Sequence, residues 1–121
     1  MEDKSCKTPR WRILKSQLNN ISIVDFNKRI KTEEDIIIVD VRTVSEFESG
    51  HIEGAINISY LADDFWDKTE QLDNSKLIFV YCRTGRRSIR ACTLMKNGGF
   101  DNQRVFNMDG GYEDYLELQT S

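Results

Sequence analysis

The sequence contains few of the residues that build metal sites, disulfide frameworks or rigid turns. It has one histidine, three cysteines and one proline among 121 residues. The cysteines lie far apart, without the paired spacing of metal ligands, and their odd number gives no disulfide framework, which favours a reducing compartment. No stretch is apolar enough to span a membrane, and the acidic start does not resemble a signal peptide. We therefore expect a cytoplasmic location for the sequence as it stands, or the cell envelope if an upstream signal has been removed.

An excess of positive charge is also lacking. Seventeen lysines and arginines face twenty aspartates and glutamates, for a net charge of −3 at pH 7. This balance argues against nucleic acid as a general partner. A hydrophobic content of 39% with 31% charged residues is typical of one soluble globular domain that needs no disulfides. We expect an N-terminal extension over residues 1–16 and a single domain over 17–121, as a monomer rather than an obligate oligomer.

Short apolar runs alternate with helical patterns along this domain. The runs predict strands at residues 20–21, 36–39, 56–58, 77–81 and 105–107, and the patterns predict helices at 22–29, 43–49, 61–68, 88–97 and 112–118. A continuous apolar run such as 36–39 is typical of a parallel strand buried on both faces. The alternation predicts an α/β fold, with a small, mostly parallel five-stranded sheet flanked by helices on both faces.

The most informative stretch runs from Cys82 to Ser88, with the sequence CRTGRRS. It follows the apolar run 77–81 and precedes a helical pattern that Ser88 can cap. A loop that turns into a helix N-terminus directs backbone N–H groups and the helix dipole at one point, and Gly85 permits close backbone approach. These groups and the arginines favour a thiolate. The loop therefore indicates an anionic sulfur nucleophile that accepts a small anionic substrate, although a buried structural cysteine beside solvated arginines is the alternative.

Three segments together resemble the single-domain rhodanese family of sulfurtransferases. They are residues 38–57, which include Asp40, Arg42 and Glu46, the loop 82–88, and residues 107–112. They occur in the family's order and extend the resemblance over residues 20–118. The resemblance implies a rhodanese-like fold and transfer of a sulfane sulfur from a donor such as thiosulfate. It implies a persulfide on Cys82, and an acceptor that is cyanide, a thiol or a sulfur-acceptor protein, with neither a cofactor nor a metal.

The resemblance also implies roles for the matched residues. Cys82 is the expected nucleophile, and the expected substrate-binding residues are Arg83, Thr84, Gly85, Arg86, Arg87 and Ser88. Asp40 and Arg42 are expected to support the site from a neighbouring strand, with Arg42 paired to Glu46. His51 and Cys92 are expected to be structural, and residues 110–111 to form a tight turn near the site. Thr84 stands where thiosulfate-specialised relatives have lysine, so the physiological donor stays open.

Two other functions of this fold stay open. One is a phosphatase or arsenate reductase, which places its cysteine in the same loop. Only four residues separate Cys82 from Arg87, one fewer than in phosphatases of this architecture, and no general acid is evident after the loop. The other is a sulfur carrier or partner-binding module without turnover, and inactive members of that kind commonly lack the cysteine. The sequence favours sulfur transfer.

Overall fold

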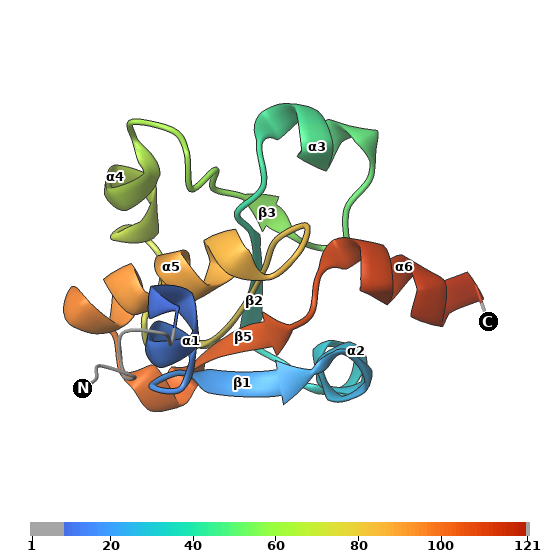
Figure 1. Ribbon diagram of the computed structural model, residues 1–121, viewed down its shortest axis with the longest axis horizontal. Helices are drawn as coiled ribbons and strands as arrows, with labels where there is room; N and C mark the ends of the chain where they lie inside the picture. Colours follow the sequence, from blue (N-terminus) through green and yellow to red (C-terminus); the bar gives the residue numbers. More distant parts are fainter. Residues whose placement is uncertain (1–8, 121) are drawn as a thin grey trace, which may run out of the picture.

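The computed structural model describes residues 9–120 and consists of alternating strands and helices (Figure 1). The strands are Asn19–Ser22 (β1), Ile36–Asp40 (β2), Ile56–Asn57 (β3), Leu77–Tyr81 (β4) and Val105–Asp109 (β5). The α-helices are Arg10–Lys15 (α1), Ile23–Thr32 (α2), Val44–Ser49 (α3), Phe65–Thr69 (α4), Arg86–Asn97 (α5) and Tyr112–Thr120 (α6), and a 3₁₀ helix (η2) lies at Asn102–Arg104. The predicted α/β fold is thereby confirmed.

The strands form one sheet in the order β1-β5-β4-β2-β3, and each of these pairings is parallel. β4 is the central strand, and its last four residues are fully buried. Asp40 at the end of β2 pairs in register with Tyr81 at the end of β4. The carboxyl ends of parallel strands meet at one edge of a sheet, which is where ligands bind in folds of this kind. Cys82 follows β4 directly and so lies in the middle of that edge.

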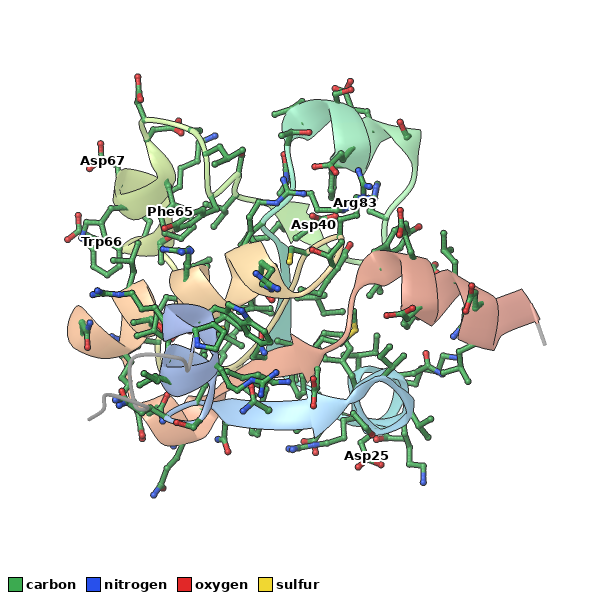
Figure 2. All side chains as sticks on the ribbon, in the orientation of Figure 1. Asp25, Asp40, Phe65, Trp66, Asp67 and Arg83 are labelled. Atoms are coloured by element: carbon green, nitrogen blue, oxygen red, sulfur yellow. The ribbon has the colours of Figure 1, made fainter. Side chains whose placement is uncertain are left out.

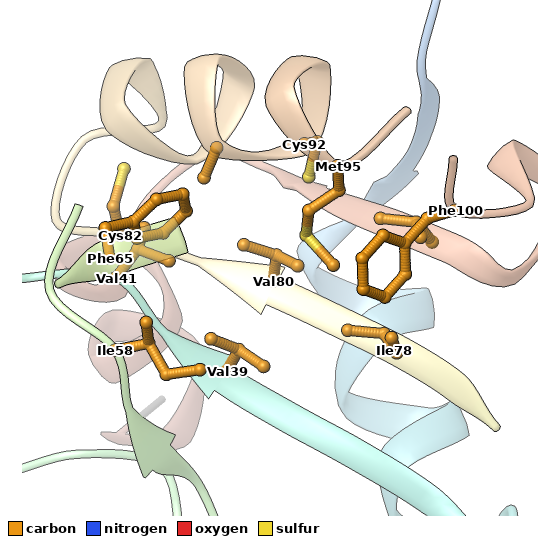
Figure 3. Packing of buried hydrophobic residues seen from close by; sticks show 12 residues of the cluster. Val39, Val41, Ile58, Phe65, Ile78, Val80, Cys82, Cys92, Met95 and Phe100 are labelled. Atoms are coloured by element: carbon orange, nitrogen blue, oxygen red, sulfur yellow. The ribbon is translucent and has the colours of Figure 1, made fainter. Parts of the chain in front are cut away.

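Side chains of β4 alternate between two hydrophobic clusters, one on each face of the sheet. Ile78, Val80 and Cys82 belong to the cluster beneath α5 (Figure 3). Phe79 and Tyr81 belong to the cluster beneath α2 and α6. Helices therefore cover both faces, as the sequence predicts. The same alternation determines that the thiol of Cys82 points toward α5.

The helices differ from the sequence-based expectation in several places. α5 begins at Arg86 and not at Ser88, because Gly85 adopts a φ of 99° and turns the chain straight into the helix without a side-chain cap. Ser88 consequently lies in the first helical turn, where its Oγ donates to the Gly85 carbonyl at 3.2 Å. α4 is shorter than predicted and begins at Phe65. α1 forms inside the expected extension and packs against α5 (Figure 1), whereas residues 1–8 of that extension lie outside the described residues.

Candidate active site around Cys82

The side chain of Cys82 is enclosed by its own loop. Cys82 has 0% of its surface exposed. Its Sγ accepts hydrogen bonds from the backbone N–H of Gly85 at 3.0 Å and of Ser88 at 3.3 Å. The second donor belongs to the first turn of α5, where backbone N–H groups have no partner within the helix. Two backbone donors and the positive end of a helix therefore converge on one sulfur atom.

A glycine turn after β5 shapes the outside of the loop. A Cβ on Gly111 would lie 1.8 Å from the carbonyl oxygen of Arg83, so only glycine permits this approach. The backbone N–H of Tyr112 donates to the carbonyl oxygen of Cys82 at 2.9 Å. The Gly110 carbonyl oxygen lies 3.0 Å from the Cβ position of Gly85. The turn at residues 110–111 thus lies near the site, as predicted, and packs directly against the loop backbone.

Arg87 is held in place from α3. Its Nη1 and Nη2 lie 2.9 and 3.2 Å from the two carboxylate oxygens of Glu46, a paired geometry that fixes the guanidinium plane. Glu46 also accepts from the backbone N–H of Thr43, which completes the capping box of α3. The hydrogen bonds from Arg87 in particular lower the pKa of Glu46 to about 2. The predicted pair of Glu46 with Arg42 is wrong, because Arg42 turns to Asp40 instead.

Asp40, which is labelled in Figure 2, forms a buried ion pair with Arg42. The pair contacts Tyr81 and therefore lies on the opposite face of the sheet from the Cys82 thiol. Arg42 Nη2 lies 2.7 Å from Asp40 Oδ2 and donates to the Gly50 carbonyl at 2.6 Å. The Tyr81 hydroxyl donates to the same Asp40 oxygen at 2.8 Å. Burial raises the pKa of Tyr81 well above its usual range, so this hydroxyl remains a donor. These bonds connect the ends of β2 and β4 and do not touch the thiol.

Three residues of the loop, Arg83, Thr84 and Arg86, are exposed. Arg83 Nε lies 3.1 Å from a carboxylate oxygen of Glu113, but both side chains are more than half exposed, so the pair contributes little to stability. Arg86 has no carboxylate within ion-pair distance among residues 9–120. Its guanidinium lies over the ring of Trp11 in α1, 4.1 Å from the centroid. Sequence reasoning missed this contact, because nothing in the local pattern links the two segments.

His51 and Cys92 have structural surroundings. The His51 ring stacks on Phe47 with centroids 3.7 Å apart, and its Nδ1 lies 2.8 Å from the Phe47 carbonyl oxygen. Cys92 is 1% exposed within the cluster beneath α5, and burial raises its pKa well above the usual range. Across residues 9–120, metal-ligating side chains do not gather in groups of three or more. In the same part of the chain, no helix has the length and apolar character needed to cross a membrane.

Comparison with known proteins identifies the family. The model of the rhodanese-like domain matches residues 22–118. The chain belongs to the rhodanese-like domain family. A solved rhodanese-like domain from Anabaena superposes with a TM-score of 0.72 at 26% identity, covering 82% of this chain and 74% of that one. The match to the family model begins at residue 22 and therefore does not include α1.

Two curated relatives agree with this family. The "Sulfurtransferase" of Allochromatium vinosum is 29% identical over 94 residues, which cover 78% of this chain and 84% of that protein. The "Putative sulfur carrier protein YrkF" of Bacillus subtilis is 31% identical over 100 residues, which cover 83% of this chain. This chain spans only about half, 52%, of the length of that second relative. The rhodanese-like domain therefore occurs both nearly alone and as part of longer proteins.

Proposed function

We propose that this protein is a sulfurtransferase that carries a sulfane sulfur on Cys82 as a persulfide. The observation that supports this most directly is the pair of backbone N–H groups, from Gly85 and Ser88, at 3.0 and 3.3 Å from Sγ. Preorganised donors of this kind stabilise negative charge on the atom that they face. Such charge is present on the sulfur of Cys82 before it attacks a donor and on the outer sulfur of the persulfide afterwards.

The reaction has two displacement steps. The thiolate of Cys82 attacks the outer sulfur of a donor such as thiosulfate, the S–S bond of the donor breaks, and sulfite leaves with the electron pair. An acceptor thiolate or cyanide then attacks the outer sulfur of the persulfide, and Cys82 leaves as a thiolate. Dividing one difficult transfer into two easier ones is the usual benefit of covalent catalysis. Sulfur is neither gained nor lost over the cycle, and no step requires a cofactor.

The exposed surface of the loop favours a small anionic donor. Arg83 and Arg86 face solvent at the loop, whereas Arg87 is fixed by Glu46. Fixed positive charges raise the local concentration of anions and weaken as salt screens them. The names of the two curated relatives, a sulfurtransferase and a sulfur carrier, support a thiol or a sulfur-acceptor protein as the acceptor. We expect the protein to act on its donor and acceptor as a monomer.

The test is intact-mass measurement after incubation with thiosulfate or another sulfane donor. The proposal predicts a gain of one sulfur atom, lost again when cyanide is added with release of thiocyanate, and absent in Cys82→Ser. Aryl phosphate hydrolysis is measured in parallel as the matched test for phosphatase activity. Cys82-dependent hydrolysis without any gain of sulfur would overturn the proposal. A sulfur that is gained but not released to cyanide or to thiols would overturn its turnover step and leave a sulfur carrier.

A further inference from the structure

The burial of Cys82 raises the question of how a donor reaches it. With 0% of the residue exposed, Sγ has no open path to solvent in this conformation. The N–H of Gly85 lies against the sulfur at 3.0 Å, so this part of the loop encloses it. A displacement reaction requires the donor sulfur to touch Sγ. Part of the loop must therefore move before the reaction starts.

Two side chains of α1 restrain the segments around Gly85. The Trp11 ring lies 4.1 Å from the guanidinium of Arg86, the residue directly after Gly85. Lys15 Nζ lies 2.6 Å from Asp109 Oδ1, directly before the glycine turn that packs on the loop. One short helix thus contacts both the loop and the turn beside it. Neither contact lies wholly within the segment matched at 22–118, since each has one partner in α1.

A cleft of about 170 Å³ separates α1 from the loop. Its lining includes Trp11, Lys15, Thr84, Gly85, Arg86 and Asp109. A cleft of this size holds several water molecules, so the loop backbone can shift into it without displacing the hydrophobic core. A shift of Gly85 into the cleft would uncover the sulfur on that side, while the Ser88 N–H, which belongs to α5, would stay on Sγ. The Gly85 N–H would return to the sulfur when the loop closes over the bound donor.

We propose that α1 is a strap on the Cys82 loop. Trp11 and Lys15 are positioning residues that hold the loop closed, and their release admits the donor. This inference deepens the proposed function, because it concerns access to the same thiol. Its test needs no sulfur transfer, so failure of the strap and failure of the sulfurtransferase proposal give different results.

The experiment measures alkylation by iodoacetamide, a neutral reagent. The third cysteine of the sequence, Cys6, lies outside the described residues and is replaced (Cys6→Ser), so that only Cys82 and Cys92 remain. Peptide mass spectrometry gives the rate at each thiol separately. Trp11→Ala is expected to speed alkylation of Cys82 about two- to fivefold, the factor that corresponds to an exposed cation–π contact. Cys92 serves as the internal reference for wider unfolding, because it is 1% exposed in the core, and its rate is expected not to change. Trp11→Phe, which keeps an aromatic ring, is expected to stay close to the parent.

Two further variants test whether Trp11 acts through Arg86. Ile13→Ala changes a half-exposed residue of the same helix (47% exposed) and is expected to leave the Cys82 rate unchanged. In an Arg86→Gln background, Trp11→Ala is expected to add little. An unchanged Cys82 rate in Trp11→Ala would overturn the proposal. So would an equal acceleration at Cys92, or an equal effect of Ile13→Ala, because either would reflect loss of general stability.

Discussion

The surroundings of Cys82 and Cys92 differ, although both thiols are buried in the same hydrophobic cluster (Figure 3). Cys82 lies at the end of a strand, where the start of α5 directs backbone N–H groups toward its sulfur. Cys92 lies in the middle of α5, where backbone groups are already paired within the helix. Burial, and to a smaller extent the nearby Cys82, raises its pKa. Burial therefore does not determine what a thiol can do. The chemistry open to a thiol depends on its position relative to the unpaired N–H donors at a helix N-terminus.

Replacing each thiol is the strongest way to break this comparison. Cys82→Ser should lower thiosulfate:cyanide sulfur transfer by at least about three orders of magnitude, because a hydroxyl cannot form the persulfide. Cys92→Ala should retain most of the activity per folded molecule. Initial rates of thiocyanate formation measure both. Retained activity in Cys82→Ser, or its loss in folded Cys92→Ala, would reverse the assignment of the two residues.

Gly111→Ala disturbs the Cys82 side of the comparison alone. The new Cβ would lie 1.8 Å from the Arg83 carbonyl oxygen, so the loop or the turn must shift. We expect a loss of about 1–3 kcal/mol in the free energy of unfolding, as for other overpacked sites, together with at least a tenfold fall in sulfur transfer (about 1.4 kcal/mol). Urea unfolding and transfer rates measure the two effects.

Gly99→Ala is the matched control for that change. Gly99 has a φ of +107°, and nothing lies within 4 Å of its Cβ position. Alanine there brings backbone strain of about 1–2 kcal/mol without a clash at the loop. We expect Gly99→Ala to lose stability but to keep its transfer rate. Equal loss of transfer in both variants would show that the loop fails through general destabilisation.

Cys92→Ala should have a smaller effect, confined to stability. It removes one buried sulfur atom from the cluster beneath α5 and leaves a small cavity, so we expect the free energy of unfolding to fall by about 1–2 kcal/mol. Urea denaturation followed by circular dichroism measures this change. A variant as stable as the parent would show that the cluster collapses around the missing atom.

Acid should weaken the Cys82 side through Glu46. In the folded protein the pKa of Glu46 is about 2, against an ordinary value of 4.5. The unfolded chain therefore takes up this proton more readily, so the stabilisation is fully present above pH 4.5 and is lost as the pH falls toward 2. Because Glu46 and Arg87 are partly exposed, we expect a loss of about 1 kcal/mol. Urea unfolding at pH 6 and pH 3 should show it in the parent and not in Glu46→Gln.

Local patterns were enough to predict the sheet and the place of the cysteine. The apolar runs at 36–39 and 77–81 need no distant information, because a strand buried on both faces is apolar throughout. The helices predicted at 22–29 and 43–49 form as α2 and α3, capped by Ser22 and Thr43, since a capping side chain bonds to backbone only three residues away. Cys82 then follows the central strand automatically. What depends on neighbours in the sequence was therefore predictable.

Contacts between segments that are distant in the sequence could not be predicted from local patterns. Arg42 and Glu46 are four residues apart, yet Glu46 binds Arg87, 41 residues further on, and Arg42 turns back to Asp40. The fold places α3 beside the loop, and local sequence patterns do not predict that contact. α1 was missed for a similar reason. It has no side-chain cap and no buried residue, so its packing on α5, rather than its own sequence, defines it.

The turn that shapes the Cys82 loop comes late in the chain, and this has a consequence for biosynthesis. During translation, Cys82 and α5 leave the ribosome before Gly111 and Tyr112, which pack on the loop and bond to the Cys82 carbonyl. A nascent chain that stops before residue 110 therefore carries the thiol but lacks the glycine turn that packs against its loop. The surroundings of the sulfur are complete only when β5 has joined the sheet and the start of α6 has packed against the loop. An unfinished chain therefore presents Cys82 in a loop that lacks these contacts.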